Sequence, residues 1–268
     1  MDTERFDAEG YWSDRLEHEF SLEGVGYLGL GESYNRWMYA VRRHVFRGVV
    51  KGRVDLPSAS VLDVGSGTGF YVELWRELGA RGVTGSDLTA VAVEQLGERF
   101  PDSRFQVLDL TKPLTGDPRP FDAISAMDVL FHIVDDQGYA QAIENLARLL
   151  APGGILVFTE NLLHGRTERG RHQTSRSLEE VTSLLTAVGL EVELRRPVFV
   201  LMNTPIDSDS TLLEHCWKAV NILVRGHPRR GWAVGAALFP LELGLGRLKQ
   251  EGPSTEIVVS RKRGIASN

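Results

Sequence analysis

The decisive stretch of the sequence reads Val61-Leu62-Asp63-Val64-Gly65-Ser66-Gly67-Thr68-Gly69-Phe70. Its apolar first half predicts a buried strand, and its three glycines predict a tight turn from which a helix begins. A helix start presents unpaired N–H groups and the positive end of the helix dipole, so this turn can hold a phosphate or a carboxylate. A dinucleotide loop would need glycine where Phe70 or Val72 stands, and a P-loop would need a lysine, so neither pattern fits.

Short apolar runs alternate with helical patterns along the rest of the chain. Strands are expected at residues 60–64, 82–86, 104–108, 121–126, 154–159, 191–201 and 254–261, and helices at residues 70–78, 90–100, 139–150 and 177–188. Strands that alternate with helices form parallel βαβ units, which indicates an α/β protein with a doubly wound sheet.

Two segments fall outside this alternation and divide the chain. Residues 1–57 are rich in aromatic side chains at helical spacing, which predicts a helical N-terminal lid segment or a helix packed on the domain. Residues 203–250 predict a helical insert, with an amphipathic helix at 212–224, a basic turn at 225–230 and an apolar, glycine-containing stretch after it. The core is then residues 58–202 together with 251–262.

Composition narrows the class of protein. The chain has 268 residues, of which 42% are hydrophobic and 25% charged, as in a globular protein with a real core. Its net charge of −6 disfavours nucleic acid as a partner. One cysteine cannot form an internal disulfide or a cysteine zinc cluster, and neither a signal peptide nor a membrane span is recognisable. A cytoplasmic protein without an integral membrane segment is expected.

The acid-x-Gly-x-Gly-x-Gly form, with Asp63 at the strand end, resembles the class I (Rossmann-like) S-adenosylmethionine-dependent methyltransferases of small-molecule type. The resemblance continues through Asp87, Asp109, residues 121–133, the turn at 149–158 and the helix and strand of 176–192. It covers about 59–202 and 254–261. It implies a seven-stranded sheet, mostly parallel with an antiparallel last strand, with S-adenosylmethionine as cofactor and S-adenosylhomocysteine as product.

Asp87 is the first candidate beyond the loop. It follows the second strand 18 residues after Gly69, close to the spacing of about 20 expected for a ribose-binding acid. A carboxylate can accept hydrogen bonds from both ribose hydroxyls, although an N-cap for the next helix is the alternative. The resemblance further implies that Asp109 meets the adenine. The expected cofactor residues are Asp63, Gly65, Ser66, Gly67, Gly69, Phe70, Asp87, Leu88, Asp109, Leu110 and Met127.

His132 is the leading candidate for a catalytic base, because it follows the fourth strand at the sheet edge where ligands bind, and its pKa suits the task. A capping or packing role is the alternative. Asp128 would orient His132 or contact substrate, or else cap a helix. His132 with Asp135 and Asp136 invites a metal reading, but paired acids before a helix are usually caps, so no metal is expected.

Four residues are candidates for substrate binding. Tyr34 and Trp37 belong to the aromatic N-terminal segment, and Glu160 and His164 to a polar loop after the fifth strand. The alternatives are a packed helix face and a solvated loop. The 203–250 insert would cover an apolar substrate or form a homodimer surface.

The residues together predict methyl transfer to a small-molecule hydroxyl of a natural-product or sugar-like acceptor, with His132 as base. The alternatives are C- or N-methylation of an apolar or isoprenoid-like molecule, and a non-catalytic module that binds the cofactor and regulates a partner. RNA is disfavoured by the acidic charge, and a nicotinamide oxidoreductase by the glycine register.

Overall fold

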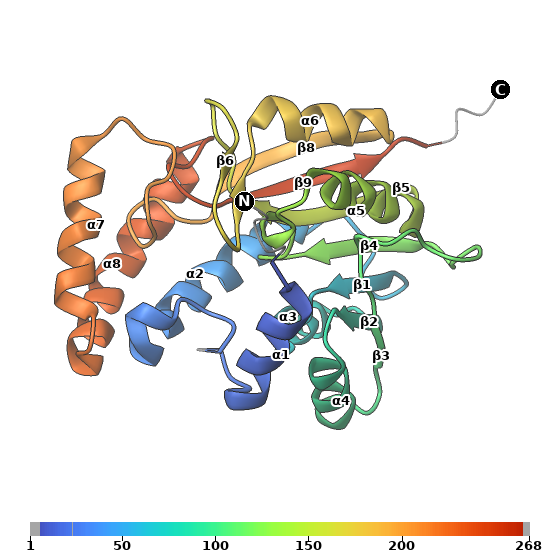
Figure 1. Ribbon diagram of the computed structural model, residues 1–268, viewed down its shortest axis with the longest axis horizontal. Coiled ribbons are helices and arrows are strands. Elements are labelled where there is room, and N and C mark those ends of the chain that lie inside the picture. Colours follow the sequence, from blue (N-terminus) through green and yellow to red (C-terminus); the bar gives the residue numbers. More distant parts are fainter. Residues whose placement is uncertain (1–5, 23, 265–268) are drawn as a thin grey trace.

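The computed structural model describes residues 6–22 and 24–264; residues 1–5 of the predicted N-terminal segment lie outside them. Its main element is a seven-stranded sheet (Figure 1). In spatial order the strands are β3 (Arg104–Val107), β2 (Gly82–Asp87), β1 (Ser60–Val64), β4 (Phe121–Ala126), β5 (Leu150–Glu160), β9 (Glu256–Lys262) and β8 (Leu190–Pro197). Strand β9 pairs antiparallel with both β5 and β8, and the other pairings are parallel. The predicted doubly wound sheet with an antiparallel last strand is confirmed.

Successive residues of a strand point to opposite faces of the sheet, so the side chains of the central strands belong alternately to two apolar layers. Val61 joins one layer, which is covered by α2 (Gly31–Val50) and α3 (Phe70–Glu77). Leu62 joins the other, under α5 (Asp136–Leu149) and α6 (Leu178–Ala187). Helix α4 (Ala90–Arg99) completes the first layer through Leu96.

The N-terminal segment is helical, as expected. It contains α1 (Ala8–His18), the short 3-10 turn η1 (Leu28–Leu30) and the long helix α2. Asp7 caps α1 by accepting a hydrogen bond from the Gly10 amide at 3.0 Å. Helix α2 buries its aromatic face, so the packing alternative holds for that helix.

The inserted segment forms two helices, α7 (Thr211–Val224) and α8 (Pro228–Leu248). The predicted basic turn at 225–230 is wrong in its second half, because Pro228 occupies the first turn of α8, where its fixed φ suits a helix. No helix of the described residues is long and apolar enough to cross a membrane.

Strand β8, which was predicted at residues 191–201, also ends earlier than predicted. It stops at Pro197 instead of residue 201, since proline cannot donate to the ladder. The amides that follow turn away from the sheet and donate to the buried carboxylate of Glu242 on α8: Val200 to Oε1, and Leu201 and Met202 each to Oε2 at 2.9 Å. Sequence patterns also missed the small hairpin of β6 (Glu168–Arg169) and β7 (Thr174–Ser175), whose residues are mostly polar.

Glu242→Ala should destabilise the protein by about 3–5 kcal/mol, because it leaves three amides, two of them on buried residues, without an acceptor. Urea unfolding would measure the loss. Glu242→Gln keeps one acceptor oxygen and should lose less. A loss below about 1 kcal/mol for the alanine variant would show that water replaces the carboxylate.

Candidate active site

The glycine loop between β1 and α3 has the backbone shape that its sequence requires. Gly65 and Gly69 have φ of 66° and 85°, which side chains other than glycine rarely adopt. A Cβ at Gly65 would lie 2.3 Å from Cγ2 of Val129, and one at Gly69 would lie 2.6 Å from the Phe100 ring. The loop is therefore closed against its neighbours on both sides.

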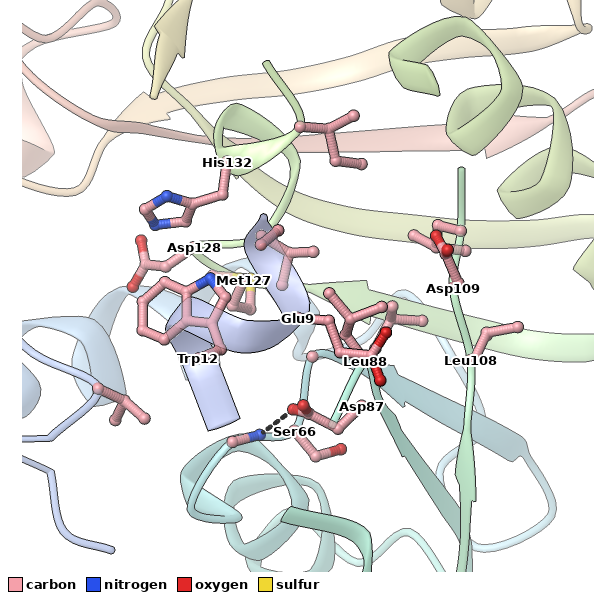
Figure 2. A pocket seen from close by; sticks show the side chains of 18 of the residues that line it. Glu9, Trp12, Ser66, Asp87, Leu88, Leu108, Asp109, Met127, Asp128 and His132 are labelled. Atoms are coloured by element: carbon pink, nitrogen blue, oxygen red, sulfur yellow. Dashed lines mark hydrogen bonds between the residues drawn. The ribbon is translucent and has the colours of Figure 1, made fainter. Parts of the chain in front are cut away.

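Asp87, at the end of β2, holds this loop. Its Oδ2 accepts from the Gly67 amide at 2.9 Å, and its Oδ1 accepts from the amide and hydroxyl of Thr89 at 3.0 and 2.9 Å (Figure 2). The predicted alternative of a helix cap is wrong, because Thr89 is the N-cap of α4 and accepts from the Ala92 amide. The Asp87 carboxylate faces a cavity instead.

Asp109 follows β3, the neighbour of β2, and lines the same cavity. Its Oδ1 accepts from the Thr111 amide and hydroxyl at 2.9 and 2.6 Å, and its Oδ2 lies 3.0 Å from the Lys112 ammonium. Burial opposes ionisation, but these hydrogen bonds outweigh it and lower the pKa of Asp109. The site therefore offers a second carboxylate beside Asp87.

The cavity has a volume of about 500 Å³, within the range of about 300–1,000 Å³ typical of small-molecule sites. Nine of the predicted cofactor residues line it: Gly65, Ser66, Gly67, Phe70, Asp87, Leu88, Asp109, Leu110 and Met127. Gly69 does not line the cavity. Asp63 does not line the cavity either. Its Oδ1 accepts a hydrogen bond from the Ser125 hydroxyl at 2.5 Å, and the Ser125 hydroxyl accepts one from the Trp75 indole at 2.8 Å. Burial raises the pKa of Asp63 to about 7.

Helix α1 and the residues before it form a wall of the cavity, although within the predicted N-terminal lid segment only Tyr34 and Trp37 of α2 were expected at the site. Glu9 and Trp12 lie across from the ends of β2, β3 and β4 (Figure 2), and Phe6 and Leu16 also line the cavity. The Trp12 ring meets the His132 ring edge-on, with centroids 5.0 Å apart. The aromatic richness of residues 1–57 was the available signal, but it did not distinguish Trp12 from the aromatics of α2.

His132 ends the 3-10 turn η2 (Leu130–His132) and lines the cavity. Burial lowers the pKa of His132 to about 4, below the value near 6.5 that made it a candidate base, although its hydrogen bond to the His172 carbonyl raises the pKa. A carbonyl can only accept, so the Nδ1 that lies 2.9 Å from it carries the proton of the neutral ring. Nε2 is then left with a lone pair that can accept a proton.

Asp128 also lines the cavity, with an unusual backbone. Its φ of 58° is the one positive value among the described non-glycine residues, a conformation that costs energy and often marks a functional site. Its Oδ2 accepts from Arg42 Nε at 2.9 Å, and its Oδ1 accepts from the Thr159 hydroxyl at 3.1 Å. Among the described contacts the His172 carbonyl, and not Asp128, orients His132.

The four predicted substrate residues do not line the cavity. Tyr34 is fully buried and donates to the Met202 carbonyl, and Trp37 packs on Trp232 and Phe239 of α8. His164 lies in an exposed ion pair with Asp207. Tyr34 and Trp37 thus serve packing, and His164 lies at the surface. The insert of 203–250 does not line the cavity either, and its role as a cover for the substrate stays a prediction.

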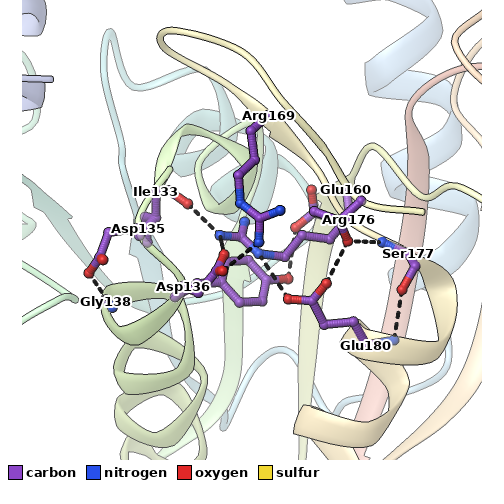
Figure 3. Close-up of polar contacts among 11 residues, drawn as sticks. Ile133, Asp135, Asp136, Gly138, Glu160, Arg169, Arg176, Ser177 and Glu180 are labelled. Carbon is purple, nitrogen blue, oxygen red and sulfur yellow. Dashed lines mark hydrogen bonds and ion pairs between the residues drawn. The ribbon is translucent and has the colours of Figure 1, made fainter. Parts of the chain in front are cut away.

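Glu160, the fourth of these residues, lies in a buried polar cluster beneath the β6–β7 hairpin (Figure 3). It accepts from the Tyr139 hydroxyl at 2.8 Å, and the Arg176 guanidinium lies over the Tyr139 ring. Arg176 also binds Asp136.

Asp135 caps α5 by accepting from the Gly138 amide at 2.7 Å. Asp135 and Asp136 thus have structural roles. The described residues contain no cluster of three side chains that could hold a metal ion.

Comparison with known proteins agrees with this geometry. Residues 61–154 match a family model described as a methyltransferase domain. A ubiquinone biosynthesis O-methyltransferase from Xanthomonas campestris pv. campestris (strain B100) is 38% identical over 111 residues, which cover 40% of this chain and 45% of that protein. One from Coxiella burnetii (strain Dugway 5J108-111) is 34% identical over 114 residues, covering 41% and 47%. The chain thus matches about half the length of these relatives.

Solved structures share the fold over most of the chain. The magnesium protoporphyrin IX methyltransferase from Synechocystis PCC 6803, solved with bound S-adenosylmethionine, has a TM-score of 0.57 at 15% identity and covers 98% of this chain and 100% of that one. The cyclase SpnF has a TM-score of 0.54 at 23% identity, covering 84% and 82%. The strand order and the loop define the class I S-adenosylmethionine-dependent methyltransferase fold.

Glu160→Gln should stabilise the protein at high pH. Burial raises the pKa of Glu160 to about 7, whereas the unfolded chain titrates near 4.5. The contribution of Glu160 to stability is therefore complete below about pH 4.5 and is lost as the pH rises through 7. Glutamine mimics the protonated acid, so the variant should exceed the wild type by about 3 kcal/mol near pH 8, a gap that closes towards pH 4.5.

Urea unfolding across this pH range would measure the gap. Glu144→Gln, at an exposed position of α5, is the matched control and should give a pH-independent difference. A gap for Glu160→Gln that does not change with pH would mean that Glu160 is ionised in the native protein.

Proposed function

We propose that the protein transfers a methyl group from S-adenosylmethionine to a hydroxyl of a small molecule. The observation that carries this proposal is the Asp87 carboxylate, which binds the Gly67 amide of the glycine loop while facing the cavity that Asp109 also lines. Two acids at the ends of neighbouring parallel strands, beside a glycine loop, suit a ligand that combines ribose, a base and an amino-acid end.

The described residues fit this cofactor. Oδ2 of Asp87 has one acceptor site left beside its hydrogen bond from the Gly67 amide, which a ribose hydroxyl can use. Asp109 with Leu110 stands where the adenine would lie. The loop of Gly65–Gly67 lacks side chains that would crowd the amino-acid end, apart from Ser66. S-adenosylmethionine supplies a methyl group already activated by the positive sulfur, so the chain has only to align the acceptor and exclude water.

His132 is the residue that we assign to proton removal. Its Nδ1 is tied to the His172 carbonyl, so Nε2 can accept a proton from an acceptor hydroxyl. Trp12 lies edge-on against the same ring. Oxygen as the methylated atom is supported by the relatives described as O-methyltransferases. The cytoplasm is the location that we propose, in line with the single cysteine.

The alternatives differ in the reaction. Methylation of carbon or nitrogen would need the same cofactor residues but no base of this kind for the first step. A regulatory module would bind the cofactor without turnover. The likeness to the cyclase SpnF concerns the fold alone, and one fold can serve several reactions. Isotope-labelled methyl donor and fragmentation of the product would identify the methylated atom.

Melting temperatures with S-adenosylhomocysteine, S-adenosylmethionine and NAD test the cofactor. A ligand at about a hundred times its Kd adds about 2.7 kcal/mol, a shift of several degrees for a domain of this size. The two sulfur ligands should raise Tm and NAD should not. Asp87→Ala should abolish the shift, whereas Glu144→Gln, far from the cavity, should keep it. Equal shifts in wild type and Asp87→Ala would contradict the role of Asp87.

His132→Ala should lower kcat by about 10²–10⁴-fold and leave the Kd of S-adenosylhomocysteine nearly unchanged, because the imidazole acts on the acceptor. Since burial lowers the pKa of His132 to about 4, the wild-type rate should not fall through loss of the neutral imidazole until the pH approaches that value. Methyl transfer to hydroxyl compounds, followed by mass spectrometry, is the measurement. An unchanged kcat in the variant would remove His132 from the mechanism.

A further inference from the structure

The two helices of the insert stand at one side of the molecule, away from the sheet, with α7 outermost (Figure 1). They pack against each other, and α8 packs on α2. We refer to residues 211–249 as the α7–α8 hairpin. The described residues include nine large hydrophobic side chains that are exposed, and six belong to this hairpin: Leu212, Ile222, Leu223, Trp232, Leu241 and Leu248. Such a concentration on one element indicates a contact surface.

Helix α7 is apolar on two sides. Trp217, Val220 and Val224 are buried and face the protein. Leu212, Cys216, Ala219 and Leu223 are spaced at i, i+4, i+7 and i+11, so they form a second stripe along the helix, and all four are exposed. A helix that only covered a core would carry polar residues along this stripe.

Helix α8 has an exposed face without charge. Ala233, Ala237, Leu241 and Gly244 follow each other at helical spacing and are exposed. The one charged residue between Arg230 and Arg247 is Glu242, which is buried against residues 200–202. The outward surface of this helix therefore consists of small and apolar side chains over four turns.

The charges of the hairpin oppose those of the whole chain. Residues 211–249 contain six lysines and arginines, Lys218, Arg225, Arg229, Arg230, Arg247 and Lys249, against two acids, Glu214 and the buried Glu242, while the chain as a whole carries −6. Arg225, Arg229 and Arg230 gather where α7 meets α8. Within the described part of the chain, none of these three forms an ion pair with an acid.

We propose that the α7–α8 hairpin docks the protein on an anionic lipid surface. The apolar side chains would enter the boundary between headgroups and acyl chains, and the unpaired arginines would meet the negative headgroups while their stems lie along the apolar part. A second copy of the chain would bring the same positive charge to this face, so it lacks the complementarity that anionic lipid provides. The proposal does not depend on methyl transfer.

Co-sedimentation of the full chain with phosphatidylcholine vesicles, with and without phosphatidylglycerol, tests the role of charge. Binding should require the anionic lipid and weaken when salt rises from about 0.1 M to about 1 M, which shortens the screening length from about 10 Å to about 3 Å. Each arginine near such a surface contributes about fivefold, so Arg229→Ser with Arg230→Ser should weaken binding about 25-fold. Arg81→Ser with Arg119→Ser, two exposed arginines elsewhere, should not.

The apolar stripe has its own test, because Cys216 is the one cysteine of the chain and lies exposed on it. An environment-sensitive dye on Cys216 should shift to the blue when anionic vesicles are added. The same dye on Arg81→Cys in a Cys216→Ser background should not respond. Ile222→Ser with Leu223→Ser should lose binding several-fold, while Val192→Ser, which removes an exposed valine from β8, should leave it intact.

Three results would overturn the proposal. One is a chain that remains in the supernatant with anionic vesicles. Another is vesicle binding that is equally strong in the hairpin variants and their controls. The third is a blue shift that appears without vesicles and grows with protein concentration, together with a dimer in sedimentation velocity, because the face would then belong to a second copy of the chain.

Discussion

The hydrogen bond from the Gly67 amide to Asp87 joins the two parts on which the candidate site depends. The glycine loop closes the end of β1, and the carboxylate ends β2, so one contact of 2.9 Å sets the spacing between them. Parallel strands place all their carboxyl ends at one edge, which brings Asp109, Met127 and Asp128 to the same cavity. The order of the strands thus places most residues of the site next to one another.

Sequence patterns predicted the parts of the site that depend on neighbours along the chain. The ends of β1 and β4 and the glycine turn follow from local apolar periodicity and backbone preference, and the structure agrees with them. Trp12 and His172, which flank His132, could not be found in this way, because their positions depend on contacts between distant segments. Tyr34 and Trp37 lie away from the cavity for the same reason, because they pack on distant residues, Tyr34 against Met202 and Trp37 against α8.

Two buried acids are a further feature that sequence patterns did not reveal. In a sequence, Glu160 looks like a polar residue of a loop that follows a strand, and Glu242 looks like a charge that interrupts an apolar helix. Both are enclosed by hydrogen-bond donors, from Tyr139 in one case and from the backbone of residues 200–202 in the other. An acid can stay inside a protein when donors converge on it, and a linear pattern contains no sign of that convergence.

The place of β9 between β5 and β8 has a consequence for synthesis of the chain. Strand β8 pairs with no other strand of the main sheet, so it has no partner until residues 256–262 have left the ribosome. The edge of β5 stays open for the same period, while the insert between β8 and β9 is already complete. A nascent chain therefore leaves one edge of β5 and both edges of β8 unpaired until β9 arrives, and β9 then pairs with β5 and with one edge of β8.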